Sequence, residues 1–140
     1  ELIKYEEQLD ENDFDNRIIL TEYCMLECYT FEKDLLINSM TDEEFTRKKV
    51  QFMNENECKI NECLKKRKKK MLNEPEILNL SDEERFEYIR KFGFTKKLVN
   101  KFRGIIGGSA FRKIDELNQN DLEKYCSSLI QDLKNAFRAN

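Results

Sequence analysis

Apolar residues along this chain recur at intervals typical of α-helices, and no stretch shows the alternation typical of a β-strand. Between residues 17 and 38 they fall on almost every side of a helix, which predicts a helix buried over most of its surface. Between residues 42 and 72 they form a narrow stripe, which predicts a helix with one buried seam. We therefore expect these two helices to pack as an antiparallel hairpin.

Capping signals define the second of these helices and the shorter ones that follow it. Thr41 precedes three acidic residues and predicts the start of the second helix, whose end is indicated by the basic run 65–70 and by Pro75. After the proline we expect about four shorter helices between residues 82 and 138. Their predicted starts are Ser81, Thr95, Ser109 and Asn120 or Asp121, and the predicted ends of the first two are Gly93 and Gly104.

Length and composition agree with a single folded domain over residues 1–140. Hydrophobic residues make up 39% of the chain and charged residues 38%, which is polar for a globular protein yet sufficient to form a core. The predicted fold class is all-α: a helical hairpin at residues 17–72 packs against a short-helix subdomain at residues 82–138. Residues 1–16 carry seven acids and one lysine and are expected to form an acidic arm.

The chain has no histidine, which removes imidazole bases, Ser-His and Cys-His nucleophile pairs and histidine metal ligands. We therefore expect no catalytic residue, metal site or cofactor, and the remaining enzymatic alternative is a thiol or carboxylate enzyme. The five cysteines are an odd number and lack closely spaced CxxC pairs, so zinc binding through cysteine alone is not expected. Two alternatives stay open for them: buried free thiols, or one disulfide between Cys24 and Cys58.

Basic residues are concentrated between Arg85 and Lys113, where nine of them accompany a single acid, Glu87, in a chain whose net charge is −3. One interpretation is structural: this face lies near the acidic arm or faces solvent. The other is functional: the face binds nucleic acid or another polyanion, helped by the N-terminus of a helix at Ser109. The candidate binding residues are Lys96, Lys97, Lys101, Arg103, Ser109, Arg112 and Lys113.

Three of the four glycines lie in the stretch GIIGGS at residues 104–109. The longer stretch FRGIIGGSA resembles the turn of helix-hairpin-helix DNA-binding motifs, a resemblance that implies phosphate binding by backbone amides. Ile106, however, stands where that motif has its second glycine. We therefore interpret the stretch as structural: Gly104 ends one helix, Ser109 caps the next, and Ile105 and Ile106 point into the core.

Residues 82–138 also resemble a sterile alpha motif in the order of their helices. FEYIRKFGF stands where that family has its first helix and turn, LVNKF resembles its second helix, and IIGGSAFRKIDELNQNDLEKY resembles its short middle helices. The glycine-containing turn before the last helix is missing. This resemblance implies a protein- or RNA-interaction module without catalysis. The abundance of Lys, Asn and Glu also resembles that of helical proteins from AT-rich parasites such as malaria parasites.

The function expected from the sequence is that of a non-catalytic helical adaptor or scaffold whose partner is another protein. Nucleic-acid or polyanion binding through residues 90–113 is the alternative, and the run KKRKKK fits a nuclear address, a patch for anionic surfaces or only a charged helix end. No apolar run approaches the roughly 18 residues that span a bilayer, so no transmembrane segment is expected. A cytoplasmic location is favoured, or an exported or secreted one if the chain is a fragment of a longer protein.

Overall fold

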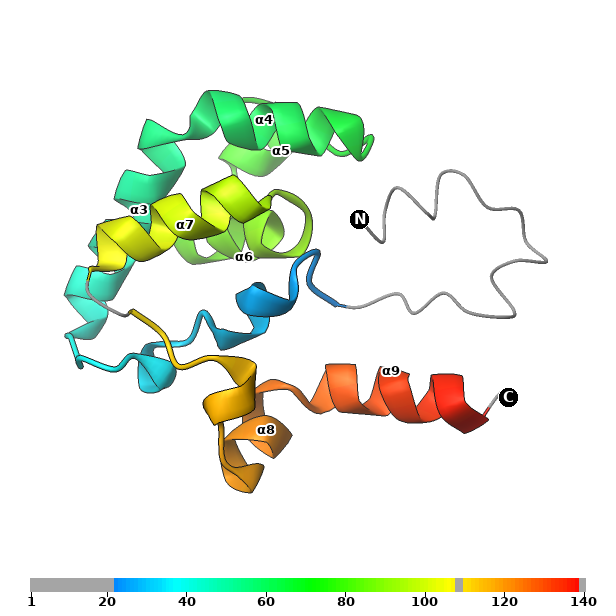
Figure 1. The fold of residues 1–140 in the computed structure, drawn as a ribbon. Helices are drawn as coiled ribbons and strands as arrows, with labels where there is room; N and C mark the ends of the chain where they lie inside the picture. The colour runs from blue at the N-terminus through cyan, green and yellow to red at the C-terminus, as the bar shows by residue number, and fades with distance from the viewer. Residues whose placement is uncertain (1–21, 108–109, 139–140) are drawn as a thin grey trace.

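The computed structural model describes residues 22–107 and 110–138, and within these ranges the fold is all-α, as the sequence predicts (Figure 1). The α-helices are α3 (Asp42–Glu55), α4 (Glu57–Lys66), α5 (Pro75–Leu78), α6 (Asp82–Phe92), α7 (Lys96–Ile106), α8 (Gln119–Tyr125) and α9 (Ser127–Arg138). Three short 3-10 helices accompany them: η1 (Leu26–Thr30), η2 (Lys33–Leu35) and η3 (Ile114–Glu116). Helix α3 packs against both α6 and α7. No helix in these ranges is long and apolar enough to cross a lipid bilayer.

Residues 22–38 do not form the helix that the sequence predicts over residues 17–38, whose first five residues lie outside the described ranges. They run as an irregular segment that contains only η1 and η2. An all-round apolar pattern cannot distinguish a buried helix from a buried irregular segment, and the aromatic and β-branched residues here are weak helix formers. The expected hairpin is therefore not confirmed. The buried apolar residues of this segment are Tyr23, Cys28, Tyr29, Phe31, Leu35 and Leu36.

The irregular segment is attached to α6 by the side chain of Arg90, which is only 4% exposed. Its guanidinium donates to the carbonyl oxygens of Cys28 at 2.7 Å and Tyr29 at 3.3 Å. It also forms ion pairs with Glu32 at 2.7 Å and Glu87 at 3.4 Å. Buried carbonyls outside regular helices need donors from elsewhere, and one arginine supplies several in a fixed geometry.

The helix predicted over residues 42–72 is interrupted at Asn56, where α3 ends and α4 begins, and α4 ends at Lys66. Asn56 is buried, and its side-chain amide donates to the carbonyl oxygen of Phe52 at 3.0 Å. Its backbone leaves the helical region, with φ −120° and ψ 19°. Asparagine offers such local side-chain bonds in competition with the helix, and this is the physical reason for the break. Two residues after α4, Lys68 has a φ of 55°.

Three predicted helix starts are confirmed at Thr41, Ser81 and Thr95. Each side chain accepts a hydrogen bond from the backbone N–H three residues later, which satisfies one of the free donors of the first turn. Ser81 and Glu84 form a complete capping box. Gly93 follows the last residue of α6, as predicted.

The helix predicted to begin at Ser109 is not formed over the described residues that follow it, and Ser109 itself lies outside the described ranges. The chain pairs instead with the irregular segment. The N–H of Ile37 donates to the carbonyl of Ala110 at 2.8 Å, and the N–H of Arg112 donates to the carbonyl of Leu35 at 2.9 Å. Because these groups bond across the fold, they are unavailable for a helix, and only η3 follows.

The last helix begins slightly earlier than the predicted start at Asn120 or Asp121. Asn118 caps α8, and its side chain accepts from the N–H of Asp121 at 2.8 Å. The helix is also interrupted at Cys126, which is 1% exposed and adopts φ −119° and ψ 18°. The continuous apolar periodicity of this region therefore covers two helices, α8 and α9.

The core is built around phenylalanine rings that come from separate parts of the chain. Phe31, in the irregular segment, contacts three other rings. The distance between ring centres is 5.2 Å to Phe94, 4.9 Å to Phe102 and 5.2 Å to Phe111. Phe52 of α3 stacks on Phe94 at 5.2 Å. Such ring pairs add stabilisation beyond the burial of their area. This one cluster therefore joins the irregular segment to α3, α7 and the chain after α7.

Truncation of Phe31 tests whether the irregular segment is part of the core. We expect Phe31→Ala to lower the free energy of unfolding by about 3 to 5 kcal/mol, because it leaves a cavity among the other rings. Leu78→Ala, at a residue 55% exposed, is the control, with an expected change below about 0.5 kcal/mol. Urea unfolding of both variants measures the difference, and equal midpoints would show that this assignment of the core is wrong.

Candidate functional site

Lys96, one of the predicted polyanion-binding residues, is paired with an acid of this chain. Its ammonium group lies 2.6 Å from the carboxylate of Glu27 in η1. Burial acts to raise the pKa of Glu27, but the hydrogen bond from Lys96 and the charges of Lys96 and Arg103 outweigh it and lower the pKa. Arg103 is half-buried. Two of the predicted binding residues thus direct their charge toward Glu27.

Other members of the basic run are also paired. The guanidinium of Arg85 lies 2.6 Å from the carboxylate of Asp82, and Arg90 is held by the two glutamates described above. The acids that oppose the basic run therefore belong to the irregular segment and to α6. The predicted acidic arm, residues 1–16, lies outside the described ranges.

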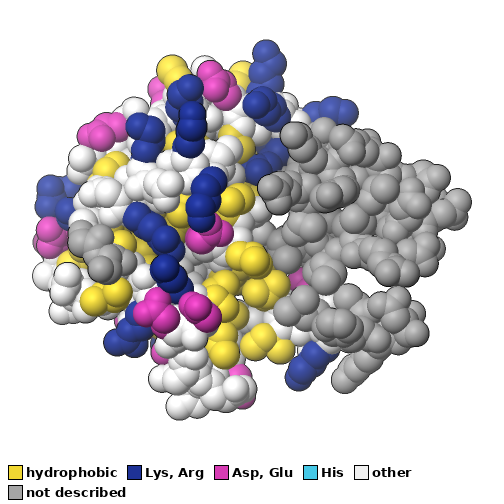
Figure 2. All heavy atoms as spheres, in the orientation of Figure 1, with side chains coloured by type: hydrophobic (Ala, Val, Ile, Leu, Met, Phe, Trp, Pro, Cys, Tyr) yellow, Lys and Arg dark blue, Asp and Glu magenta, His cyan; other side chains and the backbone are white. Residues whose placement is uncertain are grey.

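The remaining predicted residues are exposed on two different segments. Lys97 and Lys101 lie one turn apart on the outer side of α7, whereas Arg112 and Lys113 follow it in the chain. Ser109 is outside the described ranges. Figure 2 shows basic side chains distributed over the face that displays α7, with acidic and uncharged groups between them. The seven residues therefore do not share one role in the fold.

In the glycine stretch, Gly104 and Gly107 have different backbone conformations: the first is helical and the second ends the helix. Gly104, predicted to end a helix, lies inside α7, where an added Cβ would meet no atom within 4 Å. The helix continues because Ile106 is buried and Ile105 is half-buried against the core. It ends at Gly107, whose φ of 98° and ψ of 155° are readily adopted only by glycine. The predicted inward orientation of the two isoleucines agrees with their burial.

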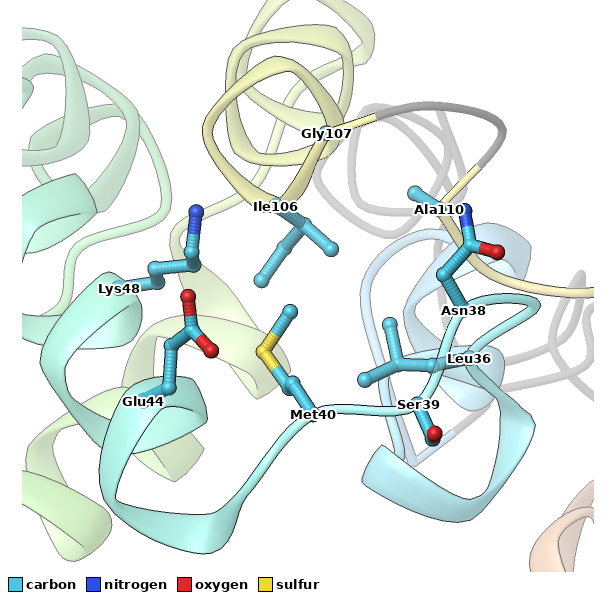
Figure 3. Close-up of a pocket in the computed structure, with 9 residues that line it drawn as sticks. All are labelled: Leu36, Asn38, Ser39, Met40, Glu44, Lys48, Ile106, Gly107 and Ala110. Atoms are coloured by element: carbon cyan, nitrogen blue, oxygen red, sulfur yellow. The ribbon is translucent and has the colours of Figure 1, made fainter.

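A pocket of about 190 Å³ lies beside this stretch, between the start of α3, the end of α7 and the loop before α3 (Figure 3). The apolar side chains of Leu36, Met40 and Ile106 point toward one another across it. The complete lining consists of Leu36, Asn38, Ser39, Met40, Glu44, Lys48, Ile106, Gly107 and Ala110. Its apolar residues thus come from two segments, 36–40 and 106–110, that are separated in sequence.

Two charged residues of α3 form the polar side of this pocket. The ammonium group of Lys48 donates to the carbonyl oxygen of Ile105 at 2.9 Å, which satisfies a free acceptor at the C-terminus of α7. Glu44 lies 3.6 Å from Arg47 in an ion pair on the same helix. The pocket therefore offers apolar contact with a carboxylate and a fixed cation beside it. The sequence carries no local signal for this arrangement.

Two cysteines, Cys24 and Cys63, converge on one carbonyl group at the turn between α6 and α7. The sulfur of Cys24 lies 3.6 Å from the carbonyl oxygen of Phe94, and the sulfur of Cys63 lies 3.7 Å from the same oxygen. Arg67 donates to this oxygen at 3.0 Å, and the same Nη1 atom lies 2.8 Å from the Cys63 sulfur. The thiol of Cys28, which is buried in η1, influences the pKa of Cys24. We refer to these three thiols and Arg67 as the thiol cluster.

The thiols of this cluster differ in their readiness to ionise. The hydrogen bond with Cys28 lowers the pKa of Cys24 to about 7; burial opposes this effect, and the positive charge of Arg67 adds to it. Burial raises the pKa of both Cys28 and Cys63, because a thiolate loses its hydration there. Of these three thiols, Cys24 therefore ionises at the lowest pH.

The cysteine alternatives left open by the sequence are distinguished by this placement. All five thiols are free, and Cys58 is exposed on α4, so the disulfide with Cys24 is not formed. Burial as free thiols applies to Cys28, Cys63 and Cys126. Within the described part of the chain, no group of three or more cysteine or acidic side chains is placed to hold a metal ion.

Comparison with known proteins does not connect these features to a family. No protein-family model, no curated protein and no solved structure matches the chain. The resemblances to helix-hairpin-helix and sterile alpha motifs therefore stay predictions from the sequence.

Gly104 inside α7 and Gly107 at its C-cap predict opposite changes in stability. Gly104→Ala should raise the free energy of unfolding by about 0.5 to 1 kcal/mol, because alanine loses less conformational entropy in a helix. Gly107→Ala should lower it by about 1 to 3 kcal/mol, because a side chain is strained at this positive φ. Thermal unfolding of both variants beside the parent measures these changes. Two changes of the same sign would contradict the end of α7 at Gly107.

Proposed function

We propose that this chain is a non-catalytic protein-interaction domain, an adaptor or scaffold, that binds a segment of another protein at the pocket between α3 and α7. The pocket itself carries this proposal. Its apolar side chains are bordered by Asn38, Ser39 and Gly107, which are exposed, so a partner can reach them from solvent. The interaction would use apolar contact and needs no reactive group.

The size of the pocket favours a side chain of a partner over a free small molecule. Its volume of about 190 Å³ is below the roughly 300 to 1,000 Å³ of typical ligand sites and suits one inserted apolar side chain. Glu44 and Lys48 would contact polar groups that flank the inserted residue.

A pocket variant and a matched surface variant test this function. The probe is a phage-displayed library of short random peptides, selected on the immobilised full chain. We expect the enriched peptides to share an apolar residue. Met40→Glu should weaken their binding by at least about tenfold, because it replaces one of the few apolar side chains of the pocket by a carboxylate. Leu78→Glu, on the exposed surface of α5, should leave the affinity unchanged, as measured by fluorescence anisotropy.

Unfolding curves for both variants separate a loss of binding from a loss of fold. If Met40→Glu does not fold, Met40→Ala replaces it, because this change removes apolar contact without adding charge. The proposal is wrong if no peptide is enriched, or if the enriched peptides bind the parent and the folded pocket variant equally well.

Nucleic-acid or polyanion binding is the second candidate function. It is favoured by Lys97 and Lys101, which are exposed one turn apart on α7 and form no ion pair with the described residues. Two adjacent lysines release only about two counterions from a nucleic acid, which gives weak binding at physiological salt. The pairing of Lys96 with Glu27 and the net charge of −3 weaken nucleic-acid binding further.

We therefore expect the parent chain not to bind labelled DNA or RNA oligonucleotides detectably at about 0.15 M salt. Lys97→Glu combined with Lys101→Glu should accordingly change nothing in an anisotropy titration, and its melting temperature serves as the control for folding. Micromolar, salt-dependent binding by the parent that is lost in the folded double variant would instead assign the function to α7.

A further inference from the structure

Residues 65–70, with the sequence KKRKKK, form the end of α4 and the turn after it. We refer to them as the lysine-rich turn. None of them lines the pocket between α3 and α7, so the proposed protein interaction leaves them without a role. We propose that the lysine-rich turn is the docking surface of the acidic arm, residues 1–16 of the same chain, and that the docked arm shields the turn from external polyanions.

The backbone of the lysine-rich turn is fixed to its neighbours. The hydroxyl of Tyr88 on α6 donates to the carbonyl oxygen of Lys70 at 2.9 Å. The guanidinium of Arg67 donates to the carbonyl oxygens of Phe92 at 2.6 Å and Phe94 at 3.0 Å. The lysine side chains are therefore displayed from a defined surface, and an acidic segment can bind several of them at once.

Half of the basic residues in this turn lack an acidic or aromatic partner and a hydrogen-bonded carbonyl among the described residues. Lys69 lies 4.3 Å over the ring of Phe92, and Lys70 forms an ion pair with Glu76. Figure 2 shows basic side chains gathered at the upper right, where α4 ends in Figure 1. The members that are exposed and form no ion pair with the described residues are Lys65, Lys66 and Lys68.

The described chain begins beside the lysine-rich turn. The sulfur of Cys24 lies 3.6 Å from the carbonyl oxygen of Phe94, and Arg67 of the turn donates to the same oxygen at 3.0 Å. The eight residues from Asn16 to Cys24 can span up to about 27 Å when extended. The acidic arm is therefore joined to the fold next to the turn, by a connection long enough to reach all of it.

The charges of the arm and the turn are complementary. The arm carries seven acids and one lysine, a net charge of −6, whereas the whole chain carries −3, so the remaining residues carry +3. One exposed ion pair contributes little to binding. Tethering, however, holds the arm near the turn at an effective concentration in the millimolar range, at which several weak ion pairs together are sufficient.

Helix α7 offers the arm a weaker surface. Lys96 at its start is already paired with Glu27 at 2.6 Å. Lys97 and Lys101 are exposed, but they are two charges one turn apart, whereas the lysine-rich turn has six basic residues in succession. Because electrostatic attraction grows with the number of charges that the arm contacts together, the arm docks on the turn and not on α7.

Carbodiimide cross-linking of the full parent chain tests the docking without any variant, because this reagent joins only carboxylates and ammonium groups in contact. At about 0.02 M salt we expect cross-links from the arm to the turn lysines to exceed those to Lys97 and Lys101 by at least about fivefold, as quantified by peptide mass spectrometry. These cross-links should disappear near 1 M salt, where the screening length is only about 3 Å.

An equal mixture of ¹⁵N-labelled and unlabelled chains shows whether the contact lies within one chain. We expect each cross-linked peptide pair to carry a single isotope. Pairs of mixed isotope would assign the turn to a second copy of the protein and overturn the proposal. Cross-links mainly to α7, or none to the turn, would also show that it is wrong.

Acetylation of lysines tests the shielding. An arm variant loses three acids of residues 1–16, and a control variant loses three exposed acids of the described fold, so that both have the same net charge. With limiting acetic anhydride, we expect the turn lysines of the arm variant to react at least about twofold faster than those of the parent and the control, because half-occupied docking already halves their exposure. The arm variant is Glu6→Gln, Glu7→Gln and Asp10→Asn; the control is Glu43→Gln, Asp115→Asn and Glu123→Gln.

Lys101 is the internal reference for these rates, and it should react equally in all three proteins. Melting curves confirm that the variants are folded. Equal acetylation of the turn lysines in the parent and the folded arm variant, or the same acceleration in the control variant, would overturn the proposal. Peptide selection on the pocket does not involve the turn, so its failure would leave this result unaffected.

Discussion

Buried backbone carbonyl groups that need donors beyond those of the helices are the constraint on which this fold depends. Arg90 donates to the carbonyl oxygens of Cys28 and Tyr29, and Arg67 donates to those of Phe92 and Phe94. An unpaired carbonyl in the interior would cost about 1 to 3 kcal/mol each. The two guanidinium groups therefore allow irregular backbone to lie inside an otherwise helical protein, and both candidate sites border such backbone.

The pocket and the thiol cluster follow from this arrangement. With the irregular segment held on α6, Phe31 enters the ring cluster, and residues 35–37 come into pairing distance of residues 110–112. This pairing forms one wall of the pocket. The thiol cluster arises in the same way, because Cys24 in the irregular segment reaches the carbonyl that Arg67 already binds. Both sites are therefore products of long-range contacts.

The sequence predicted correctly those features that depend on residues close together in the chain. The all-α class and the caps at Thr41, Ser81 and Thr95 depend on neighbouring residues, and they are confirmed. The irregular segment was not predictable, because its apolar pattern also fits a buried helix and the donors that replace helical hydrogen bonds come from Arg90, far along the chain. The grouping of Cys24 with Cys63 has the same origin, since no spacing in the sequence indicates which residues share a carbonyl.

The distance in sequence between the irregular segment and its donors sets an order of assembly. The bond from Arg90 to Cys28 spans 62 residues, and the bond from Tyr125 to Asp34 spans 91. Closing such loops costs entropy that is recovered only when the intervening chain is already compact. Loop-closure entropy therefore favours association of α3, α6 and α7 before the irregular segment docks onto them. We thus expect the first part of the described chain to leave the ribosome to be among the last to become native.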